Sequence, residues 1–307
     1  MDFRQLQYVI TVANCQSITK AAKELFISQS ALSHYIQNVE KEMGLQLFDR
    51  STTPLSLTYA GSRFLDYAQT ILWQNQELKK EFNDMTHNVT GKLKIGIPPE
   101  RAAYMLPRLI PSFSAKYPGI QLAFHTGSGV QLVELLQNGS IDFILLSMVK
   151  KEWLKELQCQ ELYKEELVIC SRQGSLAAQG LQKKGTKIFD LTILNKVPLY
   201  VENRTHILRM FCEDFFKKKG LAPLEKIELP SNIACFRMAT TGLGLAIVPF
   251  LTTRLAQSEA TAQLYSMGEE PVFWVLNALY RKNFYLSQPE KFLLSLIKEK
   301  FNHEFLV

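Results

Sequence analysis

The sequence predicts a chain in two parts, an all-helical N-terminal part and a C-terminal α/β part. Two short helical patterns separated by a tight turn lie within residues 17–43. A long helix with a repeating apolar seam follows at about residues 58–87. From residue 91 onward, short apolar runs alternate with helical patterns, which is typical of a sheet with crossover helices. A chain of 307 residues is also longer than a single hydrophobic core usually supports, so more than one domain is expected.

The N-terminal part begins with three predicted helices that share an apolar core. Asp2 and Ser28 are the expected N-caps of the first and third helices, because their side chains can accept a free backbone N–H. Gly44 supplies a stop for the third helix. The second and third helices form a helix-turn-helix pattern, in which the polar early residues of the third helix meet base edges in a DNA major groove. The alternative is a helix pair that serves only to pack.

A short hairpin is predicted after the helical core. Residues 49–58 hold a Ser/Thr/Pro cluster followed by alternating Leu and polar residues, which is typical of a turn and a short strand. Beside a helix-turn-helix, such a β-wing would bring Arg50, Thr52 and Thr53 near the DNA backbone or minor groove. The alternative is an ordinary surface hairpin.

The long helix is expected to begin after Thr58 and to end at about His87. It would be about 45 Å long at about 1.5 Å per residue. Its seam repeats in alternating steps of four and three residues and consists of Phe64, Ala68, Ile71, Asn75, Leu78, Phe82 and Met85. A helix of this length with a one-sided seam needs a partner, so self-association is expected, with packing on its own domain as the alternative. Residues 87–91 are polar, end in glycine and are interpreted as a hinge.

The C-terminal part is predicted as two sets of alternating strands and helices, and hence as two subdomains. The first set has strands at residues 92–97, 120–125 and 141–146, with helices over 102–116 and 129–138. The second set has strands at residues 166–170, 197–201 and 226–229, helices over 205–219 and 232–241, and a strand that ends at Pro249. A strand at residues 272–279 and a last helix, which opens with the capping-box spacing of Ser287 and Glu290, complete the chain. Each set favours a parallel sheet with crossover helices.

The net charge of +6 does not by itself indicate DNA binding by the N-terminal part. Residues 1–60 hold five Lys/Arg and five Asp/Glu, and residues 61–90 hold three and four. The remaining 27 Lys/Arg and 20 Asp/Glu, a net of +7, lie in residues 91–307. Any DNA affinity of the first domain must therefore come from a few placed cations, polar side chains and helix N-termini.

A ligand site is expected beyond the carboxyl ends of the predicted strands, where open α/β sheets bind ligands. The loops in such positions are residues 98–101, 126–129, 147–148 and 202–205. Arg101 and Arg204 could pair with an anion there, and Ser128 lies between two small glycines that permit backbone approach. The residues expected at this cleft are Glu100, Arg101, Ser128, Gly129, Ser147, Met148, Glu202, Asn203, Arg204 and Thr241. Ordinary loop chemistry is the alternative for each of them.

No catalytic or metal-binding pattern is found in the sequence. The five histidines lie apart, and no Walker A, Gly-x-Ser-x-Gly or complete Gly-x-Gly-x-x-Gly motif follows a strand. Glu165 and Glu166 are interpreted as a solvated pair, and His206 as a surface residue. The five cysteines are widely spaced in apolar surroundings, which favours buried, reduced thiols over a redox or metal role. Neither enzymatic activity nor a cofactor or metal is expected.

The N-terminus carries no secretory pattern and the chain has no apolar run long enough to span a bilayer, so a cytoplasmic protein without membrane contact is expected. A competing class is a solute-binding or transport-related protein of the same α/β architecture. A secretory signal would favour that class.

Several motifs within residues 1–65 resemble those of the LysR-type transcriptional regulators of bacteria. They are Ser17-Ile18-Thr19-Lys20-Ala21-Ala22, Ser28-Gln29-Ser30-Ala31-Leu32-Ser33, Gly44-Leu45-Gln46-Leu47-Phe48-Asp49-Arg50 and Leu57-Thr58-Tyr59-Ala60-Gly61. The remainder matches more loosely over its full length, as at Leu106-Pro107, Tyr117-Pro118 and Gly242-Leu243-Gly244-Leu245-Ala246. The resemblance implies a winged helix-turn-helix at residues 1–58 and a dimerising linker helix and hinge at 59–90. It implies an effector-binding domain like a periplasmic binding protein at 91–307, with one subdomain at about 91–162 and 266–307 and the other at about 163–265.

The resemblance also implies that a small effector, bound between the subdomains, changes how a tetramer holds double-stranded promoter DNA. RNA polymerase is a further candidate partner. By position, Gln29, Ser33 and residue 34 resemble the family's base- and backbone-contacting set. The full set of residues expected at the DNA interface is Ser17, Thr19, Lys20, Ser28, Gln29, Ser30, Ser33, His34, Arg50, Thr52 and Thr53. Ser30 stands where the family often has Pro, and His34 where it often has Arg, which removes a permanent cation. Linker helices of the family pair antiparallel, so direct pairing of Asn75 with its copy is not expected. The peroxide-sensing branch uses two cysteines that flank a short segment, and with only Cys212 in the matching region this branch is not expected.

Overall fold

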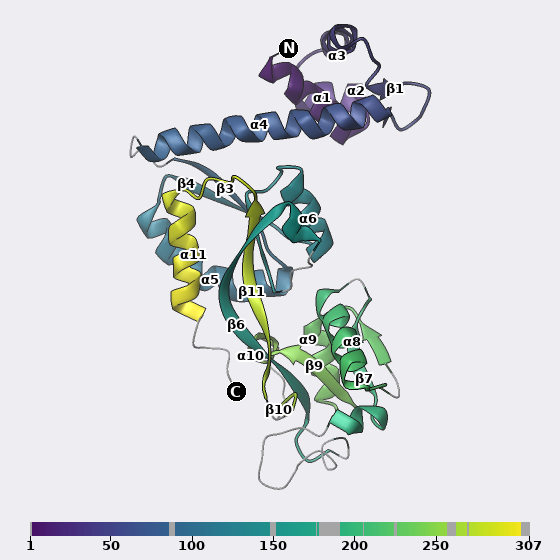
Figure 1. The fold of residues 1–307 in the computed structure, drawn as a ribbon, viewed down its shortest axis with the longest axis vertical. Coiled ribbons are helices and arrows are strands. Elements are labelled where there is room, and N and C mark those ends of the chain that lie inside the picture. The colour runs from purple at the N-terminus through teal and green to yellow at the C-terminus, as the bar shows by residue number, and fades with distance from the viewer. Residues whose placement is uncertain are drawn as a thin grey trace. The chain divides into compact units, whose positions relative to one another are not determined.

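The computed structural model describes residues 2–85, 90–147, 152–175, 177, 191–204, 206–223, 226–256, 262–268 and 270–301 (Figure 1). The chain divides into two compact units, one made of residues 1–88 with 137–140 and the other of residues 89–136 with 141–307. The two units are considered separately below.

Three capped helices form the first part of the N-terminal unit. They are α1 (Phe3–Cys15), α2 (Ile18–Glu24) and α3 (Gln29–Met43). Asp2 caps α1 in a reciprocal capping box with Gln5, and the Ser28 hydroxyl accepts the Ala31 N–H at 3.1 Å at the start of α3. Gly44 ends α3 in the left-handed conformation, with φ of 67°. The predicted caps are therefore confirmed.

The apolar faces of these helices meet in one core, to which the wing is attached. Val9, Ala21, Leu32, Ile36 and Val39 are almost fully buried together in this core. The wing consists of β1 (Phe48–Asp49) and β2 (Ser56–Leu57), which pair antiparallel. The predicted hairpin is thus present, and a side chain of α3 holds it in place.

The long helix α4 (Tyr59–Met85) starts at a capped, tightly packed turn. The Thr58 hydroxyl accepts the Gly61 N–H at 2.9 Å, and a Cβ at position 61 would collide with the Leu47 carbonyl oxygen, so only glycine fits there. The predicted seam divides into two stretches. Phe64 packs against the helical core of its own unit and Ala68 is buried, which removes both from a seam available to a partner. The side chains of Ile71, Leu78, Phe82 and Met85 are exposed, and Asn75 is half-buried.

The C-terminal unit is built on a mixed sheet in the strand order β4-β3-β5-β11-β6-β9-β7-β8, with β10 paired to β6. The strands are β3 (Gly91–Gly96), β4 (Ile120–His125), β5 (Phe143–Leu146), β6 (Leu157–Arg172), β7 (Leu199–Glu202), β8 (Lys226–Leu229), β9 (Leu245–Pro249), β10 (Ala262–Ser266) and β11 (Val272–Arg281). The helices are α5 (Pro99–Lys116), α6 (Gly129–Gln137), α8 (Ile207–Lys219), α9 (Asn232–Ala239), α10 (Phe250–Leu255) and α11 (Gln288–Phe301), with short 3₁₀ turns at Trp153–Lys155 and Leu191–Asn195.

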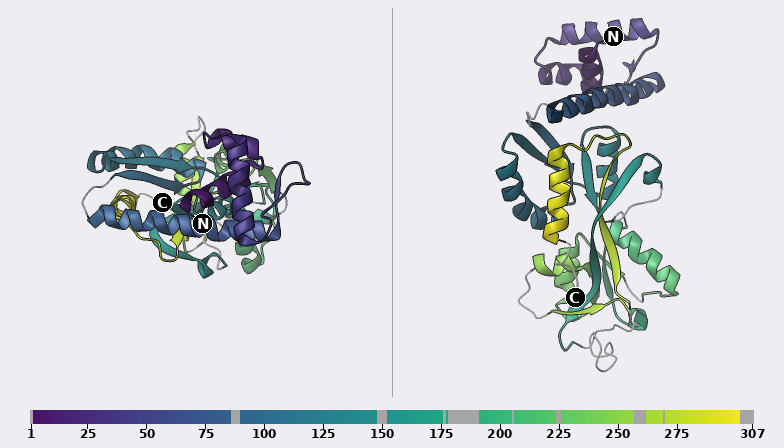
Figure 2. Two further views of the ribbon diagram at one scale, coloured as in Figure 1. Left: turned by 90° about the horizontal axis from the view of Figure 1, so that it is seen from above. Right: turned by 60° about the vertical axis from the view of Figure 1, so that its left-hand side comes forward.

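Two parallel βα groups make the two subdomains. In the first, β3 pairs in parallel with β4 and β5; in the second, β7 pairs in parallel with β8 and β9. The long strands β6 and β11 pair antiparallel with each other and run side by side from one subdomain to the other (Figure 2). β11 joins β5 of the first subdomain, and β6 joins β9 of the second. The predicted two-subdomain α/β fold is confirmed.

The observed elements differ from the predicted ones in a few places. β6 spans 16 residues, whereas the apolar pattern predicts only residues 166–170, because its first eight residues mix exposed and buried side chains and contain no apolar run. The short helix α10 and the strand β10 were not predicted. The Ser287–Glu290 spacing does form a helix start, since the Glu290 carboxylate accepts the Ser287 N–H at 2.7 Å.

Candidate functional site

The residues predicted to contact DNA lie on α2, on the first turns of α3 and on the wing. Exposed positions are Thr19, Lys20, Ser28, Gln29, Ser30, His34, Arg50, Thr52 and Thr53, whereas Ser17 and Ser33 are half-buried. Two of the predicted residues also hold helix ends, because the hydroxyls of Ser17 and Ser28 are the N-caps of α2 and α3. The surface formed by these residues therefore consists of polar side chains on the wing and on two helices, α2 and α3, whose first turns are fixed by serine N-caps.

The wing is tied to α3 by one carboxylate. Glu40 of α3 accepts the N–H groups of Leu47 and Phe48 at 2.9 and 3.2 Å, and its other oxygen accepts Arg50 Nη2 at 3.0 Å. The charge of Arg50 is thus offset by Glu40, although its side chain remains 44% exposed. This contact fixes the wing relative to α3 and leaves Arg50 at the surface as part of an ion pair.

A cavity of about 400 Å³ opens in the C-terminal unit, where α5, α6, α8, α9 and α10 begin. Its volume lies in the range of small-molecule sites, about 300–1,000 Å³. Seven of the ten predicted cleft residues line it: Glu100, Arg101, Ser128, Gly129, Ser147, Glu202 and Asn203. The remaining lining residues are Pro98, Pro99, Gly127, Leu146, His206, Ile207, Pro230, Ser231, Asn232, Pro249, Leu251, Thr252, Leu255 and Trp274.

Three predicted cleft residues have a different outcome. Arg204 does not line the cavity; its side chain is 82% exposed and its Nε lies 3.8 Å from a Glu228 oxygen. Thr241 is an exposed residue after α9, where its hydroxyl donates to the Met238 carbonyl at 2.7 Å. Met148 lies outside the described residues. Arg204 therefore supplies no charge to the cavity, because it follows β7 by two residues and points to the rim of β8.

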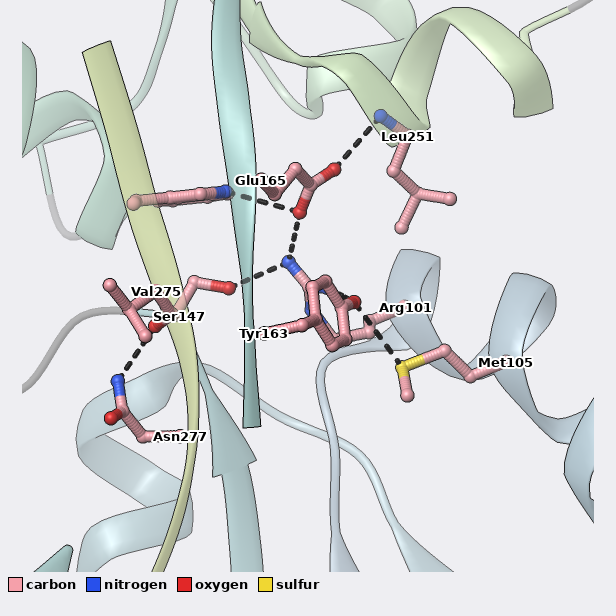
Figure 3. Close-up of polar contacts among 9 residues, drawn as sticks. Arg101, Met105, Ser147, Tyr163, Glu165, Leu251, Val275 and Asn277 are labelled. Carbon is pink, nitrogen blue, oxygen red and sulfur yellow. Dashed lines mark hydrogen bonds and ion pairs between the residues drawn. The ribbon is translucent and has the colours of Figure 1, made fainter. Parts of the chain in front are cut away.

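Arg101, which could pair with a ligand anion by its position in the sequence, is buried and held by three side chains. Its Nη1 donates to the Tyr163 hydroxyl at 2.6 Å, and its Nη2 donates to Ser147 Oγ at 2.6 Å and to Glu165 Oε2 at 3.0 Å (Figure 3). Burial lowers the pKa of Arg101, but the fields of Tyr163 and Glu165 outweigh it and raise the pKa above its ordinary value. The guanidinium stays charged, and that charge is already balanced within the protein.

Glu165 connects the two subdomains through buried hydrogen bonds. It is fully buried, and besides Arg101 it accepts the Leu251 N–H of α10 at 2.8 Å and the Trp274 indole N–H at 3.1 Å. The interpretation of Glu165 and Glu166 as solvated is therefore wrong, since Glu166 is also buried and accepts the Ser266 hydroxyl. Sequence spacing could not show this, because the partners of both carboxylates lie more than 60 residues away along the chain.

A second charged cluster lies on the wall formed by β7 and α8. Glu202 is buried, and its Oε2 lies 2.5 Å from Nδ1 of His206, one turn further along. Burial raises the pKa of Glu202 although His206 acts against it. For His206, burial lowers the pKa, but the contact with Glu202 and the charges of Glu202 and Glu100 outweigh this effect and raise it. The His206 side chain is 39% exposed, as expected of a surface residue, and it also lines the cleft.

The loop that precedes α9 was missed by the sequence analysis. Asn232 is 5% exposed, lines the cavity and has an Oδ1 atom without a hydrogen-bond partner. The Ile233 N–H donates to Glu100 Oε1 at 3.4 Å, so a carboxylate of the first subdomain reaches a helix start in the second. The rule that selected the other four loops also selects this one, because it directly follows β8. Trp274, by contrast, lies within β11 and carries no local signal.

The cysteines and histidines of the described residues provide no metal cluster. Cys170, Cys212 and Cys235 are buried as predicted, whereas Cys15 is half-buried and Cys159 is exposed. Burial raises the pKa of the Cys212 and Cys235 thiols to about 12. These two thiols are therefore protonated and poorly nucleophilic at neutral pH.

A winged helix-turn-helix joined by a long helix to a two-subdomain α/β unit with a ligand-sized cleft defines a DNA-binding regulator that senses a small molecule. Residues 3–62 match the family described as bacterial regulatory helix-turn-helix protein, lysR family, and residues 86–302 match the LysR substrate binding domain. The chain belongs to the LysR family of bacterial transcriptional regulators. Members of this family bind promoter DNA and small-molecule effectors and form oligomers.

Individual relatives agree with this assignment. The chain is 30% identical over 265 residues to YybE of Bacillus subtilis (strain 168), an uncharacterized HTH-type transcriptional regulator, covering 85% of this chain and 86% of YybE. It resembles a full-length OxyR variant from Pseudomonas aeruginosa with a TM-score of 0.76 at 21% identity, covering 97% and 98% of the two chains. Full-length CbnR complexed with its target DNA gives a TM-score of 0.62 at 21% identity, covering 97% and 99%. At this identity the solved structures show a common fold only.

No described helix is both long and apolar enough to cross a membrane.

Proposed function

We propose that this regulator reads its promoter through α3 and the wing, and that a small molecule in the cleft controls that binding. The observation that carries the first half is the start of α3. Gln29, Ser30 and His34 are exposed on the first turns of a helix that Ser28 caps and whose opposite face is buried. Polar side chains on a rigid helix of this kind can meet base edges in the major groove.

The cleft supports the second half of the proposal. It lies where two subdomains meet around β6 and β11, so a bound molecule would contact both of them. Side chains from α5, α6, α8, α9 and α10 face it, and a change in the angle between the subdomains would alter these contacts. Such a ligand can shift the protein only through a difference in its affinity for the two arrangements.

Self-association is assigned to the exposed part of the α4 seam, from Ile71 to Met85. Apolar side chains at this spacing pair with a second helix in water. We assign residues 1–58 to DNA binding, 59–90 to the linker helix and hinge, and 91–307 to the effector domain. The subdomains are assigned to about residues 91–162 with 266–307, and to about 163–265. A cytoplasmic protein without catalytic activity or cofactor agrees with relatives that are transcriptional regulators.

The test uses a DNA site that the full-length wild-type protein selects from a random-sequence library. Gln29→Ala should weaken binding to that site by about 1–3 kcal/mol, about 5- to 150-fold, because a base contact is lost. Ser33→Ala should weaken it less, since Ser33 is half-buried. Gln7→Ala removes an exposed amide from α1 and serves as the control. If gel-shift titration gives equal affinities for Gln29→Ala and Gln7→Ala, then α3 does not read the site through Gln29.

A further inference from the structure

Three of the five helix starts around the cleft, which would attract an anionic ligand, already donate to acceptors of the protein itself. At α10, the Leu251 N–H donates to Glu165 at 2.8 Å. At α9, the Ile233 N–H donates to Glu100 at 3.4 Å. At α6, the Ser128 N–H donates to Gln131 Oε1 at 2.9 Å, and Ser128 Oγ accepts the Gln131 N–H in return. Free N–H groups at helix starts are what make them anion sites, and these ones are occupied.

The cations of the cleft are occupied as well. Among the lining residues that the structure describes, Arg101 and His206 are the basic ones. Arg101 is 6% exposed and faces Glu165, and His206 lies against Glu202. Each positive charge thus has a negative partner inside the protein, so an incoming carboxylate or phosphate would have to displace one of them.

Acceptors, in contrast, are left over. Asn232 Oδ1 is buried against the cavity without a partner, and Glu202 is nine-tenths buried beside His206, with a further hydrogen bond from the Asn232 backbone. Glu100 receives one long hydrogen bond and has no basic side chain within ion-pair distance among the described residues. With Arg101 balanced by Glu165 and His206 by Glu202, the carboxylate of Glu100 is the charge that remains. The rest of the wall is apolar and includes Leu146, Ile207, Leu251, Leu255 and Trp274.

We infer that the cleft takes a small organic cation, an amine whose ammonium group faces Glu100, Glu202 and Asn232 and whose apolar body packs on the opposite wall. This inference rests on the proposed function, because it names the chemical class of the effector. An ammonium group supplies three donors and a positive charge. The charge matches the unbalanced carboxylate of Glu100, and the donors match this carboxylate, the Asn232 amide oxygen and the remaining lone pairs of Glu202. An anion of the same shape meets no basic side chain on the described wall that lacks an acidic partner, and the starts of α6, α9 and α10 already donate to protein acceptors.

The test compares three ligands with one body and different heads: cyclohexylmethylamine, cyclohexylmethanol and cyclohexanecarboxylate. Binding to the full-length protein is measured by isothermal titration calorimetry near neutral pH, up to millimolar concentration. The amine should bind at least about tenfold more tightly than the carboxylate, because it alone forms charge-assisted hydrogen bonds with the wall. Glu100→Gln should weaken the amine about tenfold and leave the alcohol unchanged within about twofold. Glu134→Gln removes an exposed charge from α6 away from the cavity and should leave all three unchanged.

Three results would overturn the inference. They are a carboxylate that binds as tightly as the amine, an amine affinity that responds equally to Glu100→Gln and Glu134→Gln, and no binding of the amine at millimolar concentration. Gel-shift titration on the same preparations separates this outcome from the proposed function. A protein that binds its selected DNA but does not prefer the amine keeps the proposed function and loses only this inference. A protein that prefers the amine but binds no DNA keeps this inference about the ligand class and loses the proposed function.

Discussion

Replacing Glu165 with Ala should destabilise the effector domain more than any surface change. Glu165 is fully buried between the subdomains and accepts from Arg101 Nη2, the Trp274 indole and the Leu251 N–H at 3.0, 3.1 and 2.8 Å. The substitution removes all three acceptor contacts at once. It leaves two neutral donors unsatisfied and, more seriously, a buried guanidinium whose charge nothing offsets.

The expected loss can be worked from this geometry. Breaking a buried ion pair by removing one partner costs about 3–5 kcal/mol, because the remaining charge stays desolvated. The two unsatisfied donors would add to this, but relaxation and water entry reduce the sum, so about 3–5 kcal/mol is taken as the total. For a domain of this size, each kcal/mol shifts Tm by about 2–4 °C. Tm should therefore fall by about 6–20 °C.

Scanning calorimetry of the full-length protein measures this loss. Glu161→Ala, an exposed position on the same strand, is the control and should stay within about 0.5 kcal/mol of wild type. The double variant Arg101→Met with Glu165→Ala should recover part of the loss, because the uncompensated charge is gone. In the single variant the freed guanidinium faces the cleft, so cyclohexanecarboxylate should bind more tightly than to wild type. A Tm equal to that of Glu161→Ala, or a double variant less stable than the single one, would refute the reasoning.

Two further predictions concern the seam and the cleft. Leu78→Glu places a charge on the exposed seam of α4 and should reduce the oligomer's mass in light scattering, whereas Gln76→Glu, outside the seam, should not; an unchanged mass for Leu78→Glu would place the interface elsewhere. The raised pKa of His206 means that the folded protein holds this proton more tightly than the unfolded chain does. The resulting stabilisation is complete below the ordinary pKa of 6.5 and is lost as the pH rises through the pKa of the folded state. The pKa of Glu202 is also raised, so its contribution to stability is likewise lost as the pH rises. This loss begins at a lower pH, because the ordinary pKa of Glu202 is 4.5. Above pH 6.5 the wild-type Tm should accordingly fall more steeply than that of His206→Asn, and parallel slopes would contradict this assignment.

The N-terminal unit follows closely from local sequence. A cap needs only a side chain that reaches a backbone N–H two or three residues on, so Asp2, Ser28 and Thr58 could be predicted at helix starts and Gly44 at a helix end. The turn and its short strands follow from the same short-range chemistry. What local sequence did not show is that Phe64 belongs to the helical core, since its spacing fits both that core and the seam.

The position of the effector cleft was predicted from the sequence, but the pairing of its charged side chains was not. Helix starts after parallel strands lie at one edge of a sheet, which is why seven of ten predicted residues line the cavity. The same rule, applied to the strand before α9, would have added Asn232. Arg204 was placed wrongly because a loop position says nothing about the direction of a long side chain.

The sequence by itself therefore determined the family, the order of the elements and the edge of the sheet at which the cleft lies, because these depend on patterns within a few residues of each other. The tertiary structure decided the charge of the site. Glu165 offsets Arg101 only because β6 brings it beneath α5, 64 positions away along the chain. Glu100 meets α9 only because the two subdomains face each other, 133 positions apart. Pairing of buried charges depends on register and packing between distant segments, and a linear pattern carries neither.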